Sequence, residues 1–177
     1  MKHGKTLLTD KEVSRTLDRL AAEILERHSD CNTLALVGIQ RRGVDLAARL
    51  KDIIDAKLAF PVPLGKLDIN LYRDDWTSLA VRPTLSHTDI PFGIDDTSIV
   101  LVDDVLFTGR TVRAALEAIL DFGRPTRVEL LVLVDRGHRE LPIHADYVGK
   151  TVMTARKERV DVYVREKDGR DEVCLAE

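Results

Sequence analysis

The chain has 177 residues, of which 44% are hydrophobic and 32% are charged, with a formal net charge of −3. This length predicts a single domain spanning residues 1–177, and the balance of charges is typical of an ordinary soluble surface, which excludes a strongly basic nucleic-acid binder. Two distant cysteines, Cys31 and Cys174, give no support for a disulfide framework or a zinc site. The sequence shows no signal-peptide core and no run of about 20 apolar residues, so we expect a cytoplasmic protein that does not cross a membrane.

The first part of the sequence predicts a helix followed by a strand–helix unit. Thr9 and Glu12 have the spacing of a capping box, and the apolar residues that follow recur at helical intervals as far as His28. The run 34-LALVGI-39 is typical of a strand that is buried on both faces, and 44-VDLAARLKDII-54 predicts the helix that follows it.

The next part of the chain is less regular. The segment 67-LDINLY-72 alternates apolar and polar residues, which predicts a half-exposed strand. Residues 73–98 show no sustained period. A long irregular segment inside a compact domain is usually functional or mobile, so we expect this one to have such a role.

A second regular region follows in the middle of the chain. It predicts a strand over 99–103, a loop over 104–110, a helix over 111–122 and a buried strand over 128–134. The order of buried strand, helix and buried strand indicates a parallel sheet with crossover helices, so the predicted fold class is α/β.

The tail departs from this order. Segments 146–150, 160–166 and 172–176 predict short strands that follow the parallel core and form a small flap or an edge.

The stretch 99-IVLVDDVLFTGRT-111 places two carboxylates, Asp103 and Asp104, directly before a loop suited to an anion. The loop leads into a helix N-terminus, where backbone N–H groups and the helix dipole favour a phosphate, and Gly109 allows a close approach. Carboxylates repel a phosphate, so they must face another part of the ligand. Vicinal sugar hydroxyls and a bound magnesium ion satisfy both requirements, which predicts a ribose 5-phosphate that carries further phosphate and metal.

These residues have other interpretations. An Asp at the end of a strand with a Gly/Thr loop after it is often only a helix cap and a turn. Gly38 and Gly43 have the spacing of a P-loop, but Val44 and Asp45 stand where Lys and Ser or Thr are required, so that interpretation fails. No G-x-G-x-x-G follows a strand, so a dinucleotide fold is not indicated.

The motif at 99–111 resembles the phosphoribosyl pyrophosphate (PRPP) motif of the type I phosphoribosyltransferases. Segments 38–43, 67–75, 120–125 and 132–150 narrow the resemblance to the bifunctional pyrimidine operon regulators of that family. The resemblance implies a parallel sheet flanked by helices, a flexible loop at about 72–90 and a small hood or tail of short strands.

The resemblance also implies an activity, the transfer of the phosphoribosyl group from PRPP to uracil with release of UMP and pyrophosphate, with Mg²⁺ required. Asp103 and Asp104 would hold the ribose hydroxyls and lie near the metal, directly or through ligand or water, and Arg73 would act catalytically from the flexible loop. The 5-phosphate would be bound by Val105, Leu106, Phe107, Thr108, Gly109, Arg110 and Thr111. The pyrophosphate would be bound by the turn that contains Gln40, Arg41 and Arg42.

Residues for the base are implied by the same family. Arg136 would contact a uracil carbonyl, Tyr147 would stack on the ring, and Val148 would lie beside it. A core-packing tyrosine and a surface salt bridge are the alternatives for Tyr147 and Arg136. His138 and His144 are interpreted as structural or RNA-facing, since the reaction demands no histidine.

Members of this group also bind a loop in the leader of pyrimidine biosynthetic mRNA, promoted by UMP or UTP, and so control transcription attenuation. The basic residues that would contact RNA are Arg19, Arg27, Arg139 and Lys150. A charged helix face is usually only solvated. A homodimer or homotetramer would join two such patches. The alternative is a plain phosphoribosyltransferase for uracil or another base without RNA binding.

Overall fold

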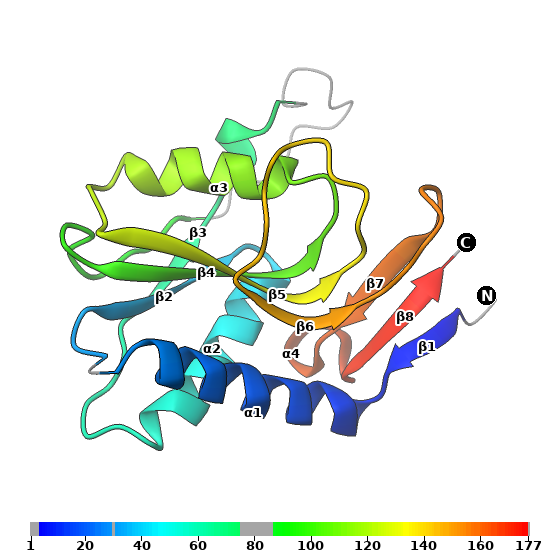
Figure 1. Cartoon of the computed structure of the whole chain (residues 1–177), viewed down its shortest axis with the longest axis horizontal. Coiled ribbons are helices and arrows are strands. Elements are labelled where there is room, and N and C mark those ends of the chain that lie inside the picture. The colour runs from blue at the N-terminus through cyan, green and yellow to red at the C-terminus, as the bar shows by residue number, and fades with distance from the viewer. Residues whose placement is uncertain (1–3, 30, 75–86, 177) are drawn as a thin grey trace.

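The computed structural model describes residues 4–29, 31–74 and 87–176, and its centre is a sheet of five parallel strands in the order β3-β2-β4-β5-β6 (Figure 1). The strands are β2 (Leu34–Ile39), β3 (Leu64–Leu67), β4 (Ser98–Leu106), β5 (Arg127–Asp135) and β6 (Tyr147–Thr151). Strands β2 and β4 are almost wholly buried, as their continuous apolar runs predict.

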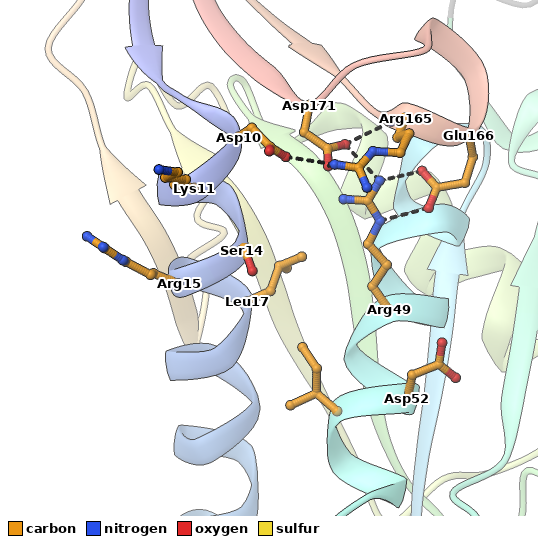
Figure 2. A pocket seen from close by; sticks show the side chains of 11 residues that line it. Asp10, Lys11, Ser14, Arg15, Leu17, Arg49, Asp52, Arg165, Glu166 and Asp171 are labelled. Atoms are coloured by element: carbon orange, nitrogen blue, oxygen red, sulfur yellow. Dashed lines mark hydrogen bonds and ion pairs between the residues drawn. The ribbon is translucent and has the colours of Figure 1, made fainter.

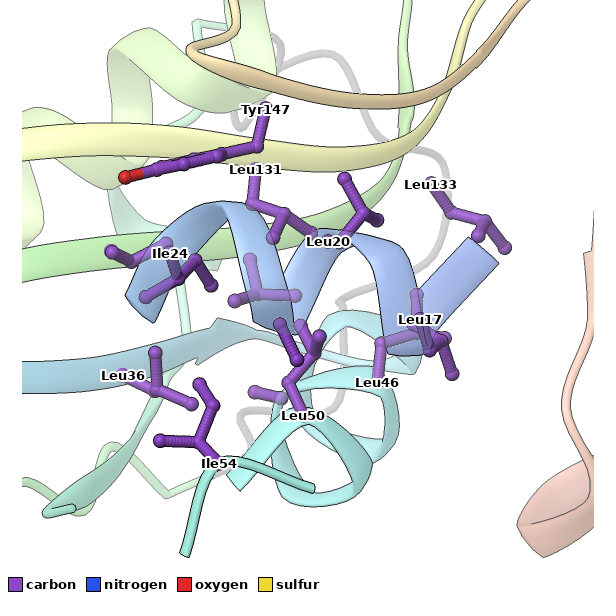
Figure 3. Packing of buried hydrophobic residues seen from close by; sticks show 14 of the residues in the cluster. Leu17, Leu20, Ile24, Leu36, Leu46, Leu50, Ile54, Leu131, Leu133 and Tyr147 are labelled. Atoms are coloured by element: carbon purple, nitrogen blue, oxygen red, sulfur yellow. The ribbon is translucent and has the colours of Figure 1, made fainter. Parts of the chain in front are cut away.

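Helices cover both faces of this sheet. Helices α1 (Asp10–Arg27) and α2 (Arg42–Asp55) pack on one face, and α3 (Arg110–Leu120) packs on the other (Figure 1). Leucine and isoleucine side chains of α1 and α2 interdigitate beneath the sheet (Figure 3). The predicted capping box is present, because the Glu12 carboxylate accepts both the backbone N–H and the hydroxyl of Thr9 at 2.8 Å. The predicted α/β class and flanked parallel sheet are confirmed.

A second, smaller sheet joins the two ends of the chain. Strands β1 (Lys5–Leu8), β8 (Glu172–Ala176) and β7 (Arg159–Tyr163) pair antiparallel in that order, and the short helix α4 (Arg165–Asp168) links β7 to β8. Strand β1 was not predicted. The tail segments divide between two places, because 147–151 form the edge of the main sheet whereas the two later strands belong to the small sheet.

The predicted strand over 67–72 is wrong. Strand β3 ends at Leu67, and residues Asn70–Tyr72 form the short 3-10 helix η1. The Asp68 carboxylate accepts the N–H of Asn70 at 2.9 Å and turns the backbone away from the sheet. The alternation of apolar residues therefore comes from a turn with buried and exposed positions. Within the predicted flexible loop at 72–90, residues 75–86 lie outside the described residues.

Among the described residues, no helix combines the length and the apolar character that crossing a membrane requires.

Candidate active site

The carboxyl end of β4 carries Asp103 and Asp104 in a buried environment. Asp103 is 7% exposed, and its Oδ1 accepts the N–H of Asp104 at 2.9 Å, while Asp104 Oδ1 accepts the N–H of Val105 at 2.8 Å. Burial and the charge of Asp104 raise the pKa of Asp103 well above its ordinary value. Burial also raises the pKa of Asp104, although the Val105 N–H and the charge of Arg42 oppose this. In the described part of the chain, neither carboxylate forms an ion pair.

The loop after β4 is shorter than predicted, because Val105 and Leu106 still belong to the strand. Leu106 is 1% exposed and its carbonyl accepts the N–H of Arg136, so its backbone is part of the sheet edge. Gly109 forms the N-cap of α3 with φ of +93°, a left-handed conformation that favours glycine. The backbone N–H groups at the start of α3 thus face the same edge as the acidic pair, which is the arrangement expected for a phosphate.

The turn between β2 and α2 lies directly beside this edge. A Cβ atom on Gly43 would come within 2.3 Å of the Val102 carbonyl oxygen and 3.2 Å of the Asp103 Cα. Only a glycine allows α2 to begin so close to β4, and this approach brings the turn against the acidic pair. The peptide bond between Gln40 and Arg41 is cis.

The two arginines of the turn face different cavities. Arg42 and Asp104 line a cavity of about 270 Å³, whereas Gln40 and Arg41 line a second cavity of about 530 Å³. The residues of the predicted pyrophosphate turn therefore line two different cavities, and Arg42 is the arginine that shares one with Asp104.

The opposite wall of the Asp104 cavity comes from β7, which was predicted only as a tail strand. Its lining residues from this strand are Arg159, Val160, Asp161, Val162 and Tyr163. The alternation of apolar and polar residues in 160–163 predicts a strand but not its place. Non-local pairing of β1, β8 and β7 puts it there, and no local pattern signals that pairing.

Of the predicted base-binding residues, Tyr147 is placed elsewhere, so its stacking role is corrected. Its side chain is 1% exposed, its hydroxyl donates to Glu129 at 3.0 Å, and its ring packs beside α1 (Figure 3). Because side chains alternate along a strand, its neighbour Val148 packs on the α3 face. Tyr147 is a core residue, the alternative considered for it.

Arg136 lies beneath the loop that follows β4. Its guanidinium stands 3.9 Å from the centre of the Phe107 ring and donates to the carbonyl of Arg156 at 3.1 Å. The side chain is 6% exposed, and burial lowers its pKa. Its Nε has no hydrogen-bond partner among the described residues. This position supports the loop, and a contact with the base remains a prediction.

Three of the four predicted RNA-binding residues gather along the seam between α1 and β6. Arg19 donates to the carbonyl of Gly149 at 2.6 Å, Arg27 lies over the Tyr147 ring at 4.7 Å, and Lys150 donates to the carbonyl of Leu7 at 2.8 Å. Arg19 and Arg27 keep 47% and 46% of their side chains exposed.

Arg139, the fourth, lies apart from this seam. It donates to the Phe107 carbonyl at 2.7 Å and pairs with Asp135 at 2.5 Å, so it braces the loop after β4. His138, interpreted as structural or RNA-facing, contacts the carbonyl of Thr154 through its Nε2 at 2.7 Å.

Arg73 and Arg110, both predicted site residues, lie where η1 meets α3. Arg73 follows η1 and is exposed. Arg110 pairs with Asp74 at 2.5 Å and with Glu140 at 2.8 Å, and Arg113 donates to the Tyr72 carbonyl at 2.7 Å. These contacts connect the described start of the 72–90 segment to α3.

A third cavity, of about 590 Å³, shares no lining residue with the other two (Figure 2). It lies between α1, α2 and the α4 region. Two of its arginines are already paired, Arg49 with Glu166 and Asp171, and Arg165 with Asp10. These paired charges therefore join α2 to the α4 region and the α4 region to α1.

The acidic pair can accommodate magnesium only with help from a ligand. No group of three metal-ligating side chains occurs among the described residues. Mg²⁺ is commonly held by one or two carboxylates together with waters and substrate phosphates, so Asp103 and Asp104 fit an ion that arrives with a phosphorylated ligand.

Comparisons with known proteins show the family of the chain. Residues 3–167 match the phosphoribosyl transferase domain family. The chain is 54% identical over 171 residues to the bifunctional protein PyrR of Elusimicrobium minutum, covering 97% of this chain and 96% of that protein. It is 52% identical over 178 residues to the bifunctional protein PyrR of Pelotomaculum thermopropionicum, covering 100% of this chain and 98% of that protein.

Solved structures support the fold. The hypoxanthine phosphoribosyltransferase of Trypanosoma cruzi matches with a TM-score of 0.74 at 18% identity, covering 98% of this chain and 96% of that chain. The enzyme of the same name from Staphylococcus aureus matches with a TM-score of 0.72 at 20% identity, covering 99% and 93%. The chain belongs to the phosphoribosyltransferase family, in the group of the bifunctional PyrR proteins.

Proposed function

We propose that the protein transfers the 5-phosphoribosyl group of PRPP to N1 of uracil, releasing UMP and pyrophosphate. One observation carries this proposal: Arg42 lines one cavity together with Asp104, which lies on the strand that leads into the loop before α3. A ligand that spans these groups carries hydroxyls for the carboxylates, a phosphate for the helix N-terminus and a second anionic group for the arginine.

The chemistry fits a site that works by positioning and charge. As the bond between C1 of the ribose and the pyrophosphate breaks, positive charge develops on the sugar and negative charge on the leaving group, while uracil N1 bonds to C1 and its proton passes to the released pyrophosphate or to water. In this proposal Asp104 lines the cavity and contacts the ribose hydroxyls directly, and Asp103 lies behind it. Arg42 neutralises the departing pyrophosphate.

Magnesium is part of the proposal. When bound with PRPP it would supply charge neutralisation at the pyrophosphate, held by Asp103 and Asp104 directly or through water. Arg73 and the segment at 72–90 would close over the bound PRPP and keep water from the sugar carbon.

We assign the base to the part of the cavity that is bounded by β7, with Arg136 and Val148 as the more distant predicted residues. Uracil offers two carbonyl acceptors and one N–H donor between them. The polar side chains of Arg159 and Asp161 and the polar edge of a strand can complement that pattern.

The test is an assay with isotopically labelled PRPP and Mg²⁺ against uracil, hypoxanthine, guanine and orotate. We expect labelled UMP and pyrophosphate with uracil and little product with the other three bases. A preference for a purine would replace uracil as the substrate and leave the site in place, whereas no turnover with any base would contradict the proposed activity.

We propose a second function, the binding of a leader mRNA loop in response to UMP or UTP. The supporting observation is the seam of Arg19, Arg27 and Lys150 between α1 and β6, where exposed guanidinium groups run along one surface. Phosphate contacts of this kind make affinity depend on salt. A homodimer or homotetramer would present two seams together.

This function is tested by titrating a leader hairpin at several salt concentrations with and without UMP. We expect affinity to fall with salt and to rise with UMP, and Arg19→Gln to weaken binding and reduce the salt dependence. Affinity that is indifferent to uridine nucleotides would point to a plain transferase.

We also propose that residues 1–177 form one domain, since β1 near one end of the chain completes the sheet that contains β7 and β8.

A further inference from the structure

Three ion pairs between described residues join α2 to α4. Arg42 pairs with Asp168 at 3.0 Å, Asp45 pairs with Lys167 at 3.1 Å, and Arg49 pairs with Glu166 at 2.6 Å. Positions 42, 45 and 49 lie three and four residues apart, so they share one face of α2. Figure 2 shows the Arg49 pair, which also includes Asp171.

The three pairs differ in what lies beside them. Arg42 lines the cavity that contains Asp104, whereas Arg49 lines the separate cavity between α1 and α2. Besides Asp168, the carboxylates of Asp104 and Asp161 also raise the pKa of Arg42 through their negative charge. Without a fixed partner, the Arg42 guanidinium is free to swing toward either of these carboxylates.

Asp168 fixes this guanidinium from two directions. Its Oδ1 accepts Nη2 of Arg42 at 3.0 Å and its Oδ2 accepts Nε at 3.3 Å, which is the side-on pairing of a guanidinium with a carboxylate. Asp168 is itself held, because its Oδ2 also accepts the N–H of Val164 at 2.8 Å. The side chain of Asp168 is only 19% exposed and that of Arg42 is 34% exposed.

We propose that Asp168 is a positioning residue that holds the Arg42 guanidinium toward the Asp104 cavity, so that the pyrophosphate of PRPP meets an already oriented cation. This inference rests on the proposed function. Asp168 acts through Arg42 and leaves the remaining N–H groups of the guanidinium available to the ligand. Because the arginine is already ordered, the binding of PRPP does not have to supply the free energy that ordering it would cost.

The test compares Asp168→Asn with the matched control Glu166→Gln. Both variants remove one negative charge from α4 and one ion pair with α2. The amide oxygen introduced by Asp168→Asn can still accept the Val164 N–H, so the start of α4 keeps this hydrogen bond. The dissociation constant of PRPP is measured with Mg²⁺ by calorimetry, together with kcat/KM for PRPP, KM for uracil and Tm.

We expect Asp168→Asn to weaken PRPP binding about tenfold while KM for uracil and Tm stay close to wild type, and Glu166→Gln to leave PRPP binding unchanged. Arg42→Gln alone should weaken PRPP binding at least as much. The double variant with Asp168→Asn should show no further loss, because the two residues act as one unit.

Equal effects of Asp168→Asn and Glu166→Gln would mean that α4 has only been loosened, and would overturn the proposal. Unchanged or tighter PRPP binding in Asp168→Asn, losses that add in the double variant, or an Arg42→Gln variant that binds PRPP normally would overturn it as well. In each of these cases wild-type turnover still stands. If the wild-type protein neither binds nor consumes PRPP, the proposed function itself fails.

Discussion

Two buried carboxylates lie toward opposite ends of the central sheet and differ in their hydrogen-bond partners and in the direction of their pKa shifts. Asp103, near the carboxyl end of β4, is 7% exposed, and Glu129, near the amino end of β5, is 6% exposed. Glu129 contacts His28 at 2.6 Å and accepts the Tyr147 hydroxyl at 3.0 Å. Burial alone would raise the pKa of Glu129, but these hydrogen bonds outweigh it and lower the pKa.

Asp103 has the opposite balance. Burial raises its pKa, its neighbour is another carboxylate, and the described residues supply it with no ion pair. A buried charge without compensation destabilises a fold, and such groups are concentrated at sites that bind or react. Glu129 is therefore a carboxylate that holds the structure together, whereas Asp103 is buried beside a second carboxylate with no ion-pair partner among the described residues.

The largest effect is expected for Asp104→Asn, because Asp104 is the member of the acidic pair that lines the cavity. We expect kcat/KM for PRPP to fall by about 10²- to 10³-fold, because the charge that faces the developing positive sugar is removed. Tm should stay the same or rise, since the raised pKa means that the ionised group costs stability in the fold. Unchanged turnover would exclude this carboxylate from the site.

The close approach of α2 to β4 offers the next largest effect. Gly43→Ala places a methyl group where only 2.3 Å separates it from the Val102 carbonyl oxygen, so the first turn of α2 must move away from Asp103. Displacement by about 1 Å costs on the order of 10²-fold in rate. Steady-state kinetics with PRPP and uracil would measure it, with Gly93→Ala as a control for the loss of glycine, because a Cβ atom on Gly93 would have no neighbour within 4 Å and Gly93 does not have a positive φ. Normal kinetics in Gly43→Ala would show that the approach is not needed.

Glu129→Gln is expected to give the reverse of Asp104→Asn. It should lower the free energy of unfolding by about 1–3 kcal/mol and leave kcat/KM unchanged, because hydrogen bonds to a charged acceptor are lost far from the cavity. Denaturant unfolding at pH 7 measures the difference. A loss of turnover without a loss of stability would reverse the roles assigned to the two ends of the sheet.

The effect of Glu129→Gln on the free energy of unfolding should also depend on pH. The pKa of Glu129 in the folded protein is below its usual value of about 4.5, so its contribution is fully present above that pH and disappears as the pH falls through the folded pKa. The gap in unfolding free energy between wild type and Glu129→Gln should therefore be widest at pH 7 and shrink as the pH falls below about 4.5. A gap that stays constant with pH would mean that the ionised form of Glu129 is not what stabilises the fold.

The smallest effect is expected at Arg139, which belongs to neither carboxylate cluster. Arg139→Gln removes donors to the Phe107 carbonyl and to Asp135, which should loosen the loop after β4 and weaken PRPP binding by about threefold to tenfold. Titration of PRPP measures this effect. A parallel titration of leader RNA distinguishes a residue that supports the loop after β4 from one that contacts RNA. An effect on RNA alone would restore the role first predicted for this residue.

The sequence predicts the parts of this fold that depend on local pattern. The capping box at Thr9, the buried runs of β2, β4 and β5 and the glycine at the start of α3 all specify their elements through neighbours in the chain. The acidic pair and the loop after it are also local, which is why their place at the carboxyl edge was predicted.

The errors concern contacts between distant residues. Tyr147 was assigned to the base because its region resembles the part of the family that receives the base, but a shift of one residue along a strand turns a side chain to the other face. Strand β1 escaped prediction because four residues contain too little pattern, and the place of β7 depends on that pairing. The partnership of Arg42 with Asp168 spans 126 residues and has no signature in either neighbourhood.

The small sheet has a consequence for the order of assembly during synthesis. Strand β7, which forms one wall of the Asp104 cavity, reaches β1 only through β8, and β8 consists of residues 172–176. A growing chain on the ribosome can form the five-stranded sheet and its acidic edge before these residues emerge. The small sheet that contains β7 is complete only when β8 has paired with both β1 and β7.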